Sequence, residues 1–123
     1  MARIARGLPA ALVLILVIAF PSQAAPQLTV QALIRDPGRF DGRVVTVMGT
    51  IAAYRERASD SGHAYTIFRL TDGDASVTVF IWNKQTLGNG QKVRVTGTFA
   101  KARSVGTVSF DNEIQANRID VVP

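Results

Sequence analysis

The sequence predicts an all-β protein, a small five-stranded closed barrel that follows a signal peptide and a short helix. A seven-residue phrase, V-x-V-x-G-T-hydrophobic, occurs at Val45–Ile51 and again, 48 positions later, at Val93–Phe99. Two alternating runs, Tyr65–Leu70 and Val77–Trp82, lie between the copies. Alternation of apolar and polar residues suits half-buried strands. A glycine inside such a strand marks a bulge, a bend or a close backbone approach, so this pattern favours closure into a barrel.

The first 24 residues have the composition of a secretory signal peptide. Arg3 and Arg6 give a basic start, Ala10–Phe20 is almost purely aliphatic, and Pro21–Ala24 supplies small residues before a cleavage site. The aliphatic run is well short of the roughly 20 residues that span a bilayer as a helix. We therefore predict cleavage near Ala24 and a periplasmic or secreted protein with no stable membrane span afterwards. An uncleaved membrane anchor is the alternative.

The exported part would have 99 residues, enough for one domain, and no cysteine. Its apolar core must hold it together without disulfides. The absence of cysteine also excludes thiol catalysis, zinc–cysteine sites and thioether-linked haem. Removal of Arg3 and Arg6 lowers the formal net charge from +5 to +3. A mildly basic domain permits binding to phosphates or anionic lipid but requires neither.

Residues 25–42 are predicted to form an N-terminal extension with a short helix. Thr29 is a suitable N-cap for a helix through Val30–Ile34. The segment Asp36-Pro37-Gly38 should end that helix, because proline and glycine do not continue it.

Residues 43–123 are predicted to form the barrel. The five strands are expected at Arg43–Tyr54, Ala64–Leu70, Ser76–Trp82 and Gln91–Lys101, and within Thr107–Val122 with an interruption near Asp111-Asn112. Between them, Arg55–His63 is expected to form an exposed polar loop and Asp72-Gly73 a tight hairpin turn. The connector Asn83–Gly90 is too short for more than one helical turn.

These elements resemble an OB-fold, and more narrowly the anticodon-binding type of nucleic-acid-binding OB domain appended to aminoacyl-tRNA synthetases and replicative polymerases, here in an exported bacterial protein. The resemblance covers about Val44–Val122 and rests on core and turn residues. These are Val45-x-Val47-x-Gly49-x-Ile51, Phe68-x-Leu70-x-Asp72-Gly73, Val77-x-Val79-Phe80 and Gly90-x-x-Val93-x-Val95-x-Gly97. The resemblance implies a single-stranded DNA or RNA partner that lies across strands two and three.

No residue pattern indicates catalysis, and we predict that the protein is not an enzyme. The sole histidine, His63, lies in the polar loop, and one histidine cannot build a multi-histidine metal site. The serines lack a G-x-S-x-G elbow, and turn geometry explains Asp72 and Asp74. The glycines of the connector do not match a P-loop. We therefore predict no catalytic residue, no metal and no cofactor.

Strands two and three indicate a binding face instead. The resemblance puts Phe68 and Leu70 inward, and alternation then turns three residues of each strand outward. These are Tyr65, Ile67 and Arg69 on strand two and Thr78, Phe80 and Trp82 on strand three. Aromatic rings stack on bases, and arginine pairs with phosphate. The adjoining loops are expected to add further cations. The predicted nucleic-acid-binding residues are Tyr65, Arg69, Phe80, Trp82, Arg55, Arg57, Lys101 and Arg103.

Other arrangements are compatible with the same residues. A register shifted by one position would turn Phe80 and Trp82 into core residues, and the helix or a partner chain could cover outer aromatics. The predicted function is that of an exported, non-enzymatic module that binds single-stranded nucleic acid. The alternative is a module that binds another envelope protein or a small ligand without affinity for nucleic acid. The orientation of Phe80 and Trp82 separates these arrangements.

Overall fold

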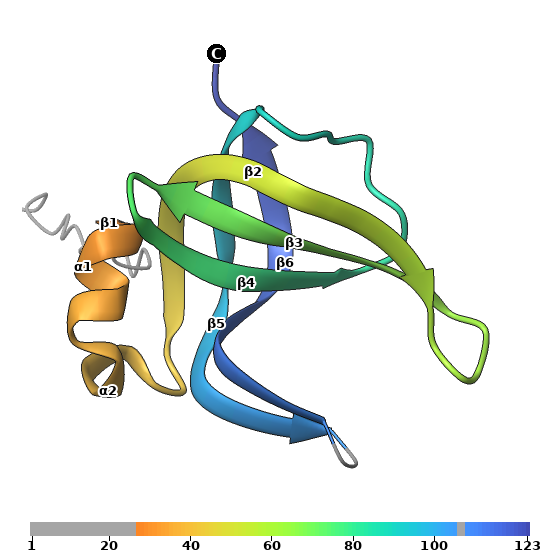
Figure 1. The fold of residues 1–123 in the computed structure, drawn as a ribbon, viewed down its shortest axis with the longest axis horizontal. Coiled ribbons are helices and arrows are strands. Elements are labelled where there is room, and N and C mark those ends of the chain that lie inside the picture. The colour runs from red at the N-terminus through yellow and green to blue at the C-terminus, as the bar shows by residue number, and fades with distance from the viewer. Residues whose placement is uncertain (1–26, 106–107) are drawn as a thin grey trace, which may run out of the picture.

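The computed structural model describes residues 27–105 and 108–123, so the predicted signal peptide and its cleavage site lie outside the described residues. The elements are β1 (Gln27–Thr29), α1 (Val30–Arg35), α2 (Pro37–Phe40), β2 (Val44–Ala58), β3 (Ala64–Asp72), β4 (Ala75–Trp82), β5 (Lys92–Val105) and β6 (Val108–Val121) (Figure 1). Within this part of the chain, neither helix has the length and apolar character needed to cross a bilayer.

Strands β2 to β6 close into a five-stranded mixed barrel. The pairs β2–β3, β3–β4, β5–β6 and β2–β5 are antiparallel, and β4–β6 is parallel. The short strand β1 adds to β2 in parallel, with Leu28 opposite Val47. The prediction of a mostly β protein with five barrel strands after a short helix is therefore confirmed. Strand β1 was not expected from the sequence.

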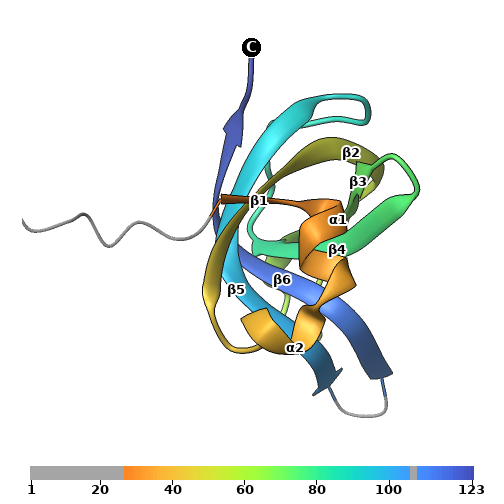
Figure 2. The same cartoon turned by 90° about the vertical axis from the view of Figure 1, so that its left-hand side faces the viewer.

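The two helical turns between β1 and β2 lie together at one end of the barrel (Figures 1 and 2). Thr29 caps α1 as predicted, because its hydroxyl accepts a hydrogen bond from the amide of Ala32 at 3.1 Å. Val30 and Leu33 are fully buried. Pro37 ends α1 as expected but also begins α2, since proline is well tolerated in a first helical turn.

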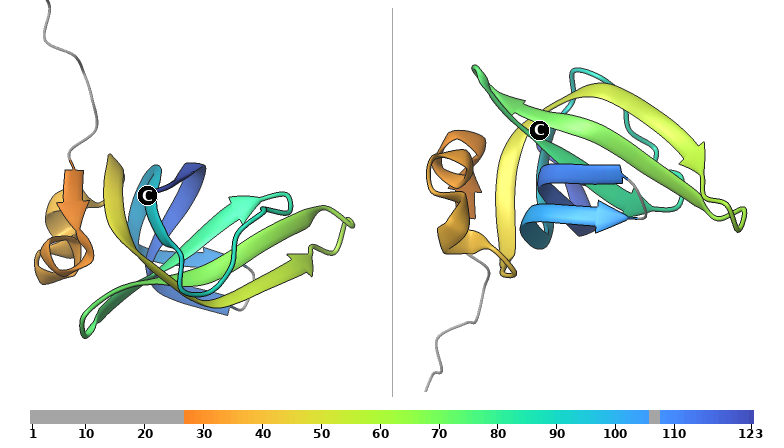
Figure 3. Two further views of the ribbon diagram at one scale, coloured as in Figure 1. Left: turned by 90° about the horizontal axis from the view of Figure 1, so that it is seen from above. Right: turned by 60° about the horizontal axis from the view of Figure 1, so that its bottom comes forward.

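Strands β2 and β5 extend further than the sequence predicted. Strand β2 continues to Ala58 and β5 to Val105, because β2–β3 and β5–β6 pairing persists beyond the barrel. The β2–β3 hairpin reaches away from the two helices (Figure 3). The expected polar loop therefore shortens to residues 59–63.

The predicted Asp72-Gly73 hairpin is confirmed, with Asp72 opposite Ala75 and a positive φ of 64° at Gly73. The predicted interruption of the last strand is reduced to a left-handed backbone at Asn112 (φ 55°), and β6 continues through it.

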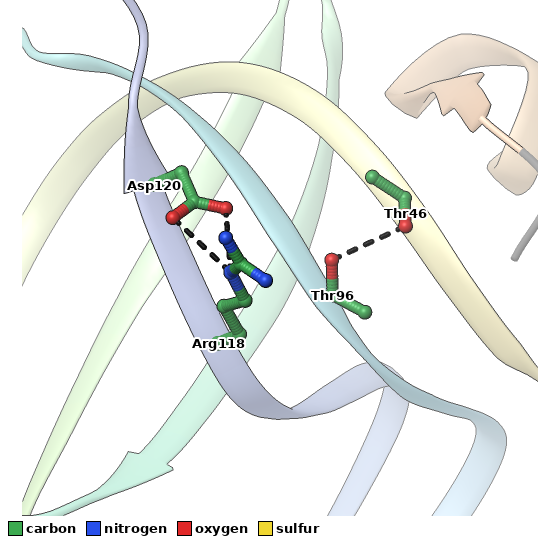
Figure 4. A network of polar contacts seen from close by, with 4 residues as sticks. All are labelled: Thr46, Thr96, Arg118 and Asp120. Carbon is green, nitrogen blue, oxygen red and sulfur yellow. Dashed lines mark hydrogen bonds and ion pairs between the residues drawn. The ribbon is translucent and has the colours of Figure 1, made fainter. Parts of the chain in front are cut away.

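The two copies of the repeated phrase pair with each other. Val45 lies opposite Gly97, Val47 opposite Val95 and Gly49 opposite Val93, so a local twofold axis passes through the Val47–Val95 pair. The four valines of the two copies are fully buried: Val45, Val47, Val93 and Val95. On the opposite side of the sheet the hydroxyls of Thr46 and Thr96 share a hydrogen bond of 3.2 Å (Figure 4).

The glycine of each copy lies where its strand meets a second neighbour. Strand β2 pairs with β5 as far as Thr50 and with β3 from Thr50 onward. A Cβ on Gly49 would lie 2.8 Å from the carbonyl oxygen of Thr71 in β3, so glycine permits a close backbone approach there. A Cβ on Gly97 would collide with the backbone of β6, 2.5 Å from the Cα of Ala116, where the β5–β6 register shifts.

Candidate nucleic-acid interface

The outer faces of β3 and β4 have the predicted orientation. Five inward side chains are at most 8% exposed: Phe68, Leu70, Val77, Val79 and Ile81. Cross-strand partners are Tyr65 with Trp82, Ile67 with Phe80 and Arg69 with Thr78, and directly opposed residues point to the same face. A one-residue shift of register, which would have buried Phe80 and Trp82, is thereby excluded.

Three aromatic rings form one cluster on this face. Tyr65 stacks on Phe80 with ring centroids 5.0 Å apart, and Trp82 meets Phe80 edge-on at 4.9 Å. Phe80 is half-buried, whereas Trp82 is 45% exposed. His63 is exposed, as predicted, and its ring lies edge-on to Trp82 at 6.3 Å. The indole is therefore the ring of this cluster that is open to a ligand.

A β-bulge brings two arginines of β2 to the same face. The β2–β3 register shifts by one residue between Ala52 and Arg55, and Ala53 has a positive φ of 53°. Ile51 is buried in the core, so strict alternation from it would turn Arg55 and Arg57 inward. The extra residue reverses the alternation, as bulges do when they re-aim side chains.

After the bulge, Arg55 pairs with Ile67 and Arg57 pairs with Tyr65. Both arginines are exposed and lie in a strand, so the expectation that they occupy a loop was wrong. The continued pairing with β3 fixes their positions more firmly than a loop would.

Tyr54 attaches the bulge to the connector between β4 and β5. Its amide donates to Oδ1 of Asn89 at 2.9 Å, and its hydroxyl donates to the carbonyl of Gln85 at 2.8 Å. Its ring stacks on Phe68 with centroids 6.4 Å apart. Burial raises the pKa of the Tyr54 hydroxyl above its ordinary value.

Arg69 is exposed and donates hydrogen bonds to the hydroxyls of Thr78, at 3.0 Å, and Ser76. These neutral partners leave its charge uncompensated. Within residues 27–105 and 108–123, no carboxylate forms an ion pair with Arg55, Arg57 or Arg69. These cations and the rings beside them make up the arginine–aromatic face, which consists of Arg55, Arg57, Tyr65, Arg69, Phe80 and Trp82.

Arg103 and Lys101 differ from the other predicted cations. Arg103 forms an ion pair with Glu113, which is 2% exposed, and its guanidinium lies 5.6 Å above the ring of Phe80. Lys101 is exposed, and its backbone amide donates to Oδ1 of Asp41 ahead of β2. Lys101, the last residue of the expected fourth strand, and Arg103 both lie in β5, so the expectation that Arg103 occupies a loop was wrong. Arg103 therefore supports the face and covers Phe80.

A hollow beside Trp82 was not expected from the sequence. Its volume is about 520 Å³, and it opens where β4 and β6 separate. Its lining includes Asn83 and Asn117, whose positions in a connector and a strand gave no sequence signal. Among the described residues, no group of three or more His, Cys, Asp or Glu side chains is arranged to hold a metal ion.

No protein-family model matches this sequence, and no curated protein matches it. Solved structures are similar in fold. A chain described as an aspartyl-tRNA synthetase from Leishmania major Friedlin has a TM-score of 0.62 and 16% identity, over 85% of this chain and 22% of that chain. A chain of yeast Stn1 and Ten1 has a TM-score of 0.62 and 12% identity, over 82% of this chain and 64% of that chain.

The OB domain of Ta0387 from Thermoplasma acidophilum has a TM-score of 0.50 and 17% identity, over 80% of this chain and 88% of that domain. At such identities the likeness concerns the fold alone. The chain has an OB-fold, as its core and turn residues predicted, and it spans about a fifth of the synthetase chain.

Proposed function

We propose that this protein is a non-enzymatic module that binds single-stranded nucleic acid through the arginine–aromatic face. The observation that carries the proposal is the register across three strands. Arg57, Tyr65 and Trp82 are direct neighbours in one row, and Arg55, Ile67 and Phe80 are neighbours in the next. Two cations in β2 therefore border the aromatic cluster of β3 and β4 in one continuous patch.

The chemistry of this patch suits a flexible polyanion with flat bases. An exposed indole stacks on a base for roughly 1–3 kcal/mol, and guanidinium groups pair with phosphate oxygens. Arg55, Arg57 and Arg69 have no competing carboxylate among the described residues, so a phosphate displaces only water and hydroxyl contacts. The synthetase that shares this fold is named for its action on tRNA, which supports the same class of ligand.

Direct titration tests the proposal. Trp82 is the sole tryptophan, so its fluorescence reports on the proposed site without a label. We expect short single-stranded DNA or RNA to quench it, with an affinity that falls as salt rises. For single strands the log–log slope is about −0.7 per phosphate neutralised, so three arginine contacts predict about −2.

Two pairs of variants separate this face from nonspecific attraction. Arg55→Ala with Arg57→Ala should weaken binding, whereas Arg35→Ala with Arg43→Ala removes the same charge from the helical end of the barrel and should not. Trp82→Ala, followed with labelled oligonucleotide, should cost about 1–3 kcal/mol of binding energy without unfolding the protein. Val121→Ala is its control, since Val121 is 53% exposed at the end of β6.

No binding to either DNA or RNA at low salt would contradict the proposal. The same barrel would then be better described as a module for another envelope protein or a small ligand, with the exposed Trp82 as its contact. Binding that Arg35→Ala with Arg43→Ala weakens as much as Arg55→Ala with Arg57→Ala would contradict the assignment of the face.

We also propose that the module acts in the periplasm or outside the cell. The basic start, the short aliphatic run and the small residues before Ala25 support removal of a signal peptide. Intact mass of the protein from the envelope fraction should correspond to a chain that starts at Ala25 or Pro26. Recovery of the full-length chain from the cytoplasm would contradict this proposal.

A further inference from the structure

The hollow beside Trp82 arises from the way in which β4 and β6 separate. Their parallel pairing runs from Thr78 opposite Glu113 to Phe80 opposite Gln115, and no further pairs follow. The hollow of about 520 Å³ opens beyond that point, within the range of 300–1,000 Å³ typical of small-ligand sites. Its lining is Ile81, Trp82, Asn83, Gln85, Ala116, Asn117, Arg118 and Ile119.

The floor of the hollow is apolar, and one wall belongs to the arginine–aromatic face. Ile81 and Ala116 are 8% and 7% exposed and come from the core side of their strands. Trp82 lines the hollow and also packs edge-on against Phe80. Trp82 is therefore shared by the outer face and the hollow.

The rim carries two carboxamides that are free to bind a ligand. Asn83 and Asn117 are exposed, and neither side chain forms a hydrogen bond within residues 27–105 and 108–123. Gln85 is engaged instead, because its Nε2 donates to the carbonyl of Trp82 at 3.2 Å. Arg118 adds a cation that is 72% exposed and is held by Asp120 at 2.9 Å (Figure 4).

The backbone of Asn83 is fixed on both sides, which positions its side chain. Its amide donates to the carbonyl of Ala64 at 2.7 Å, and its carbonyl accepts from the hydroxyl of Thr66 at 2.9 Å. It has a positive φ of 74°, a conformation that asparagine tolerates better than most residues. The carboxamide is thus presented from a rigid corner next to Trp82.

We propose that this hollow is a base-reading pocket that selects adenine within the bound strand, an inference that rests on the proposed function. An asparagine carboxamide offers a donor and an acceptor side by side, which complement the N6 amine of adenine together with either N7 or N1. Cytosine offers such a pair on one edge only, at N4 and N3, so two carboxamides can both engage adenine but not cytosine. Single-stranded bases are commonly read in this way, splayed out and stacked on an aromatic ring while their edges form hydrogen bonds. Trp82 supplies the ring, and Asn83 and Asn117 supply the edge contacts.

The test uses oligothymidine strands that differ at one central position, which holds adenine, cytosine, guanine or thymine. Quenching of Trp82 fluorescence gives the affinity of each strand. We expect the strand with adenine to bind at least about fivefold more tightly than the strand with cytosine, which corresponds to the lower end of discrimination by one bidentate contact.

The variant Asn83→Gly with Asn117→Ala should reduce this preference to less than about twofold while the strand with cytosine binds as before. Glycine keeps the left-handed backbone at position 83, and thermal unfolding of the variant checks that the barrel is intact. Gln115→Ala is the matched control, because it removes a carboxamide from β6 two residues away and outside the lining. It should keep the preference.

Each outcome bears on a different statement. Equal affinity of the wild type for all four strands overturns the pocket and leaves the proposed function intact. A preference that survives in Asn83→Gly with Asn117→Ala shows that other residues read the base, and also overturns it. Absence of binding to every strand contradicts the proposed function itself.

Discussion

Arg55 and Arg103 occupy equivalent positions, 48 residues apart, each four residues after the end of a copy of the repeated phrase. Their surroundings differ. Arg55 is exposed and has no carboxylate partner among the described residues, whereas Arg103 is paired with the buried Glu113 and covers Phe80. Arg55 in β2 is exposed to solvent, whereas Arg103 in β5 pairs with a buried carboxylate of the barrel.

A difference in strand register accounts for the different surroundings of Arg55 and Arg103. In β2 the pairing with β3 shifts after Ala52, at the bulge. In the β5–β6 pair the shift lies between Thr96 and Gly97, and the extra residue, Asn117, belongs to β6, so the alternation of β5 itself continues without a break to Val105. Similar residues at equal spacing therefore do not share an environment once a neighbouring strand changes register.

The largest expected effects concern the two glycines. Gly97→Val should destabilise the protein by at least about 3 kcal/mol, because its side chain would meet the backbone of Gln115 and Ala116. Gly49→Val should cost less, about 1–3 kcal/mol, since part of its contact is with the flexible side chain of Leu70. Denaturant unfolding of both variants measures the difference. Equal costs would argue that the two copies tolerate a side chain alike.

The two arginines should differ next in their effect on stability. Arg103→Ala leaves the carboxylate of Glu113, 2% exposed, without its cation and should cost about 1–3 kcal/mol, less than a fully buried pair because Arg103 itself is 30% exposed. Arg55→Ala should change stability by no more than about 0.5 kcal/mol. Thermal unfolding monitored by circular dichroism compares them. A similar loss in both would show that the ion pair does not distinguish the copies.

Binding should rank the same two residues in the opposite order. Arg55→Ala should lower the magnitude of the salt slope for single-stranded oligonucleotide by about 0.7, because one phosphate contact is lost. Arg103→Ala should leave the slope unchanged, since Glu113 already neutralises that charge. If only Arg103→Ala changed the salt slope, the phosphate contacts would lie on the β5–β6 hairpin and not on β2.

The smallest expected effect is a gain in stability, whereas most substitutions lower it. Ala53→Gly should stabilise the protein by about 0.5–1 kcal/mol, because glycine adopts the positive φ of 53° without the cost that alanine bears there. Ala52→Gly is the control and should destabilise it, since residue 52 has ordinary strand geometry and glycine is disfavoured in strands. Destabilisation by both changes would show that the bulge is not strained.

The sequence predicted the barrel and the orientation of β3 and β4, because alternation around Phe68 and Val79 is long and strict. It did not predict the bulge at Ala53, since alanine is not a residue that marks a left-handed backbone. The predicted ends of β2 and β5 were too early for a related reason. Polar residues such as Arg57 predict a loop unless the strand that pairs with them is known. The hollow depends on where β4 and β6 separate, which is a property of tertiary structure, and Asn83 and Asn117 carry no local sign of it.

The bulge at Ala53 also bears on how such a face arises in evolution. Because side chains alternate with a period of two, no single arginine substitution beyond Ile51 recreates the row of Arg55 and Arg57 beside Tyr65. An in-frame insertion of one codon does so at once, and its deletion turns the same arginines inward with no arginine codon altered. Among related barrels, gain or loss of this cationic row would therefore appear as a one-residue gap in the first long strand, where a count of substitutions would overlook it.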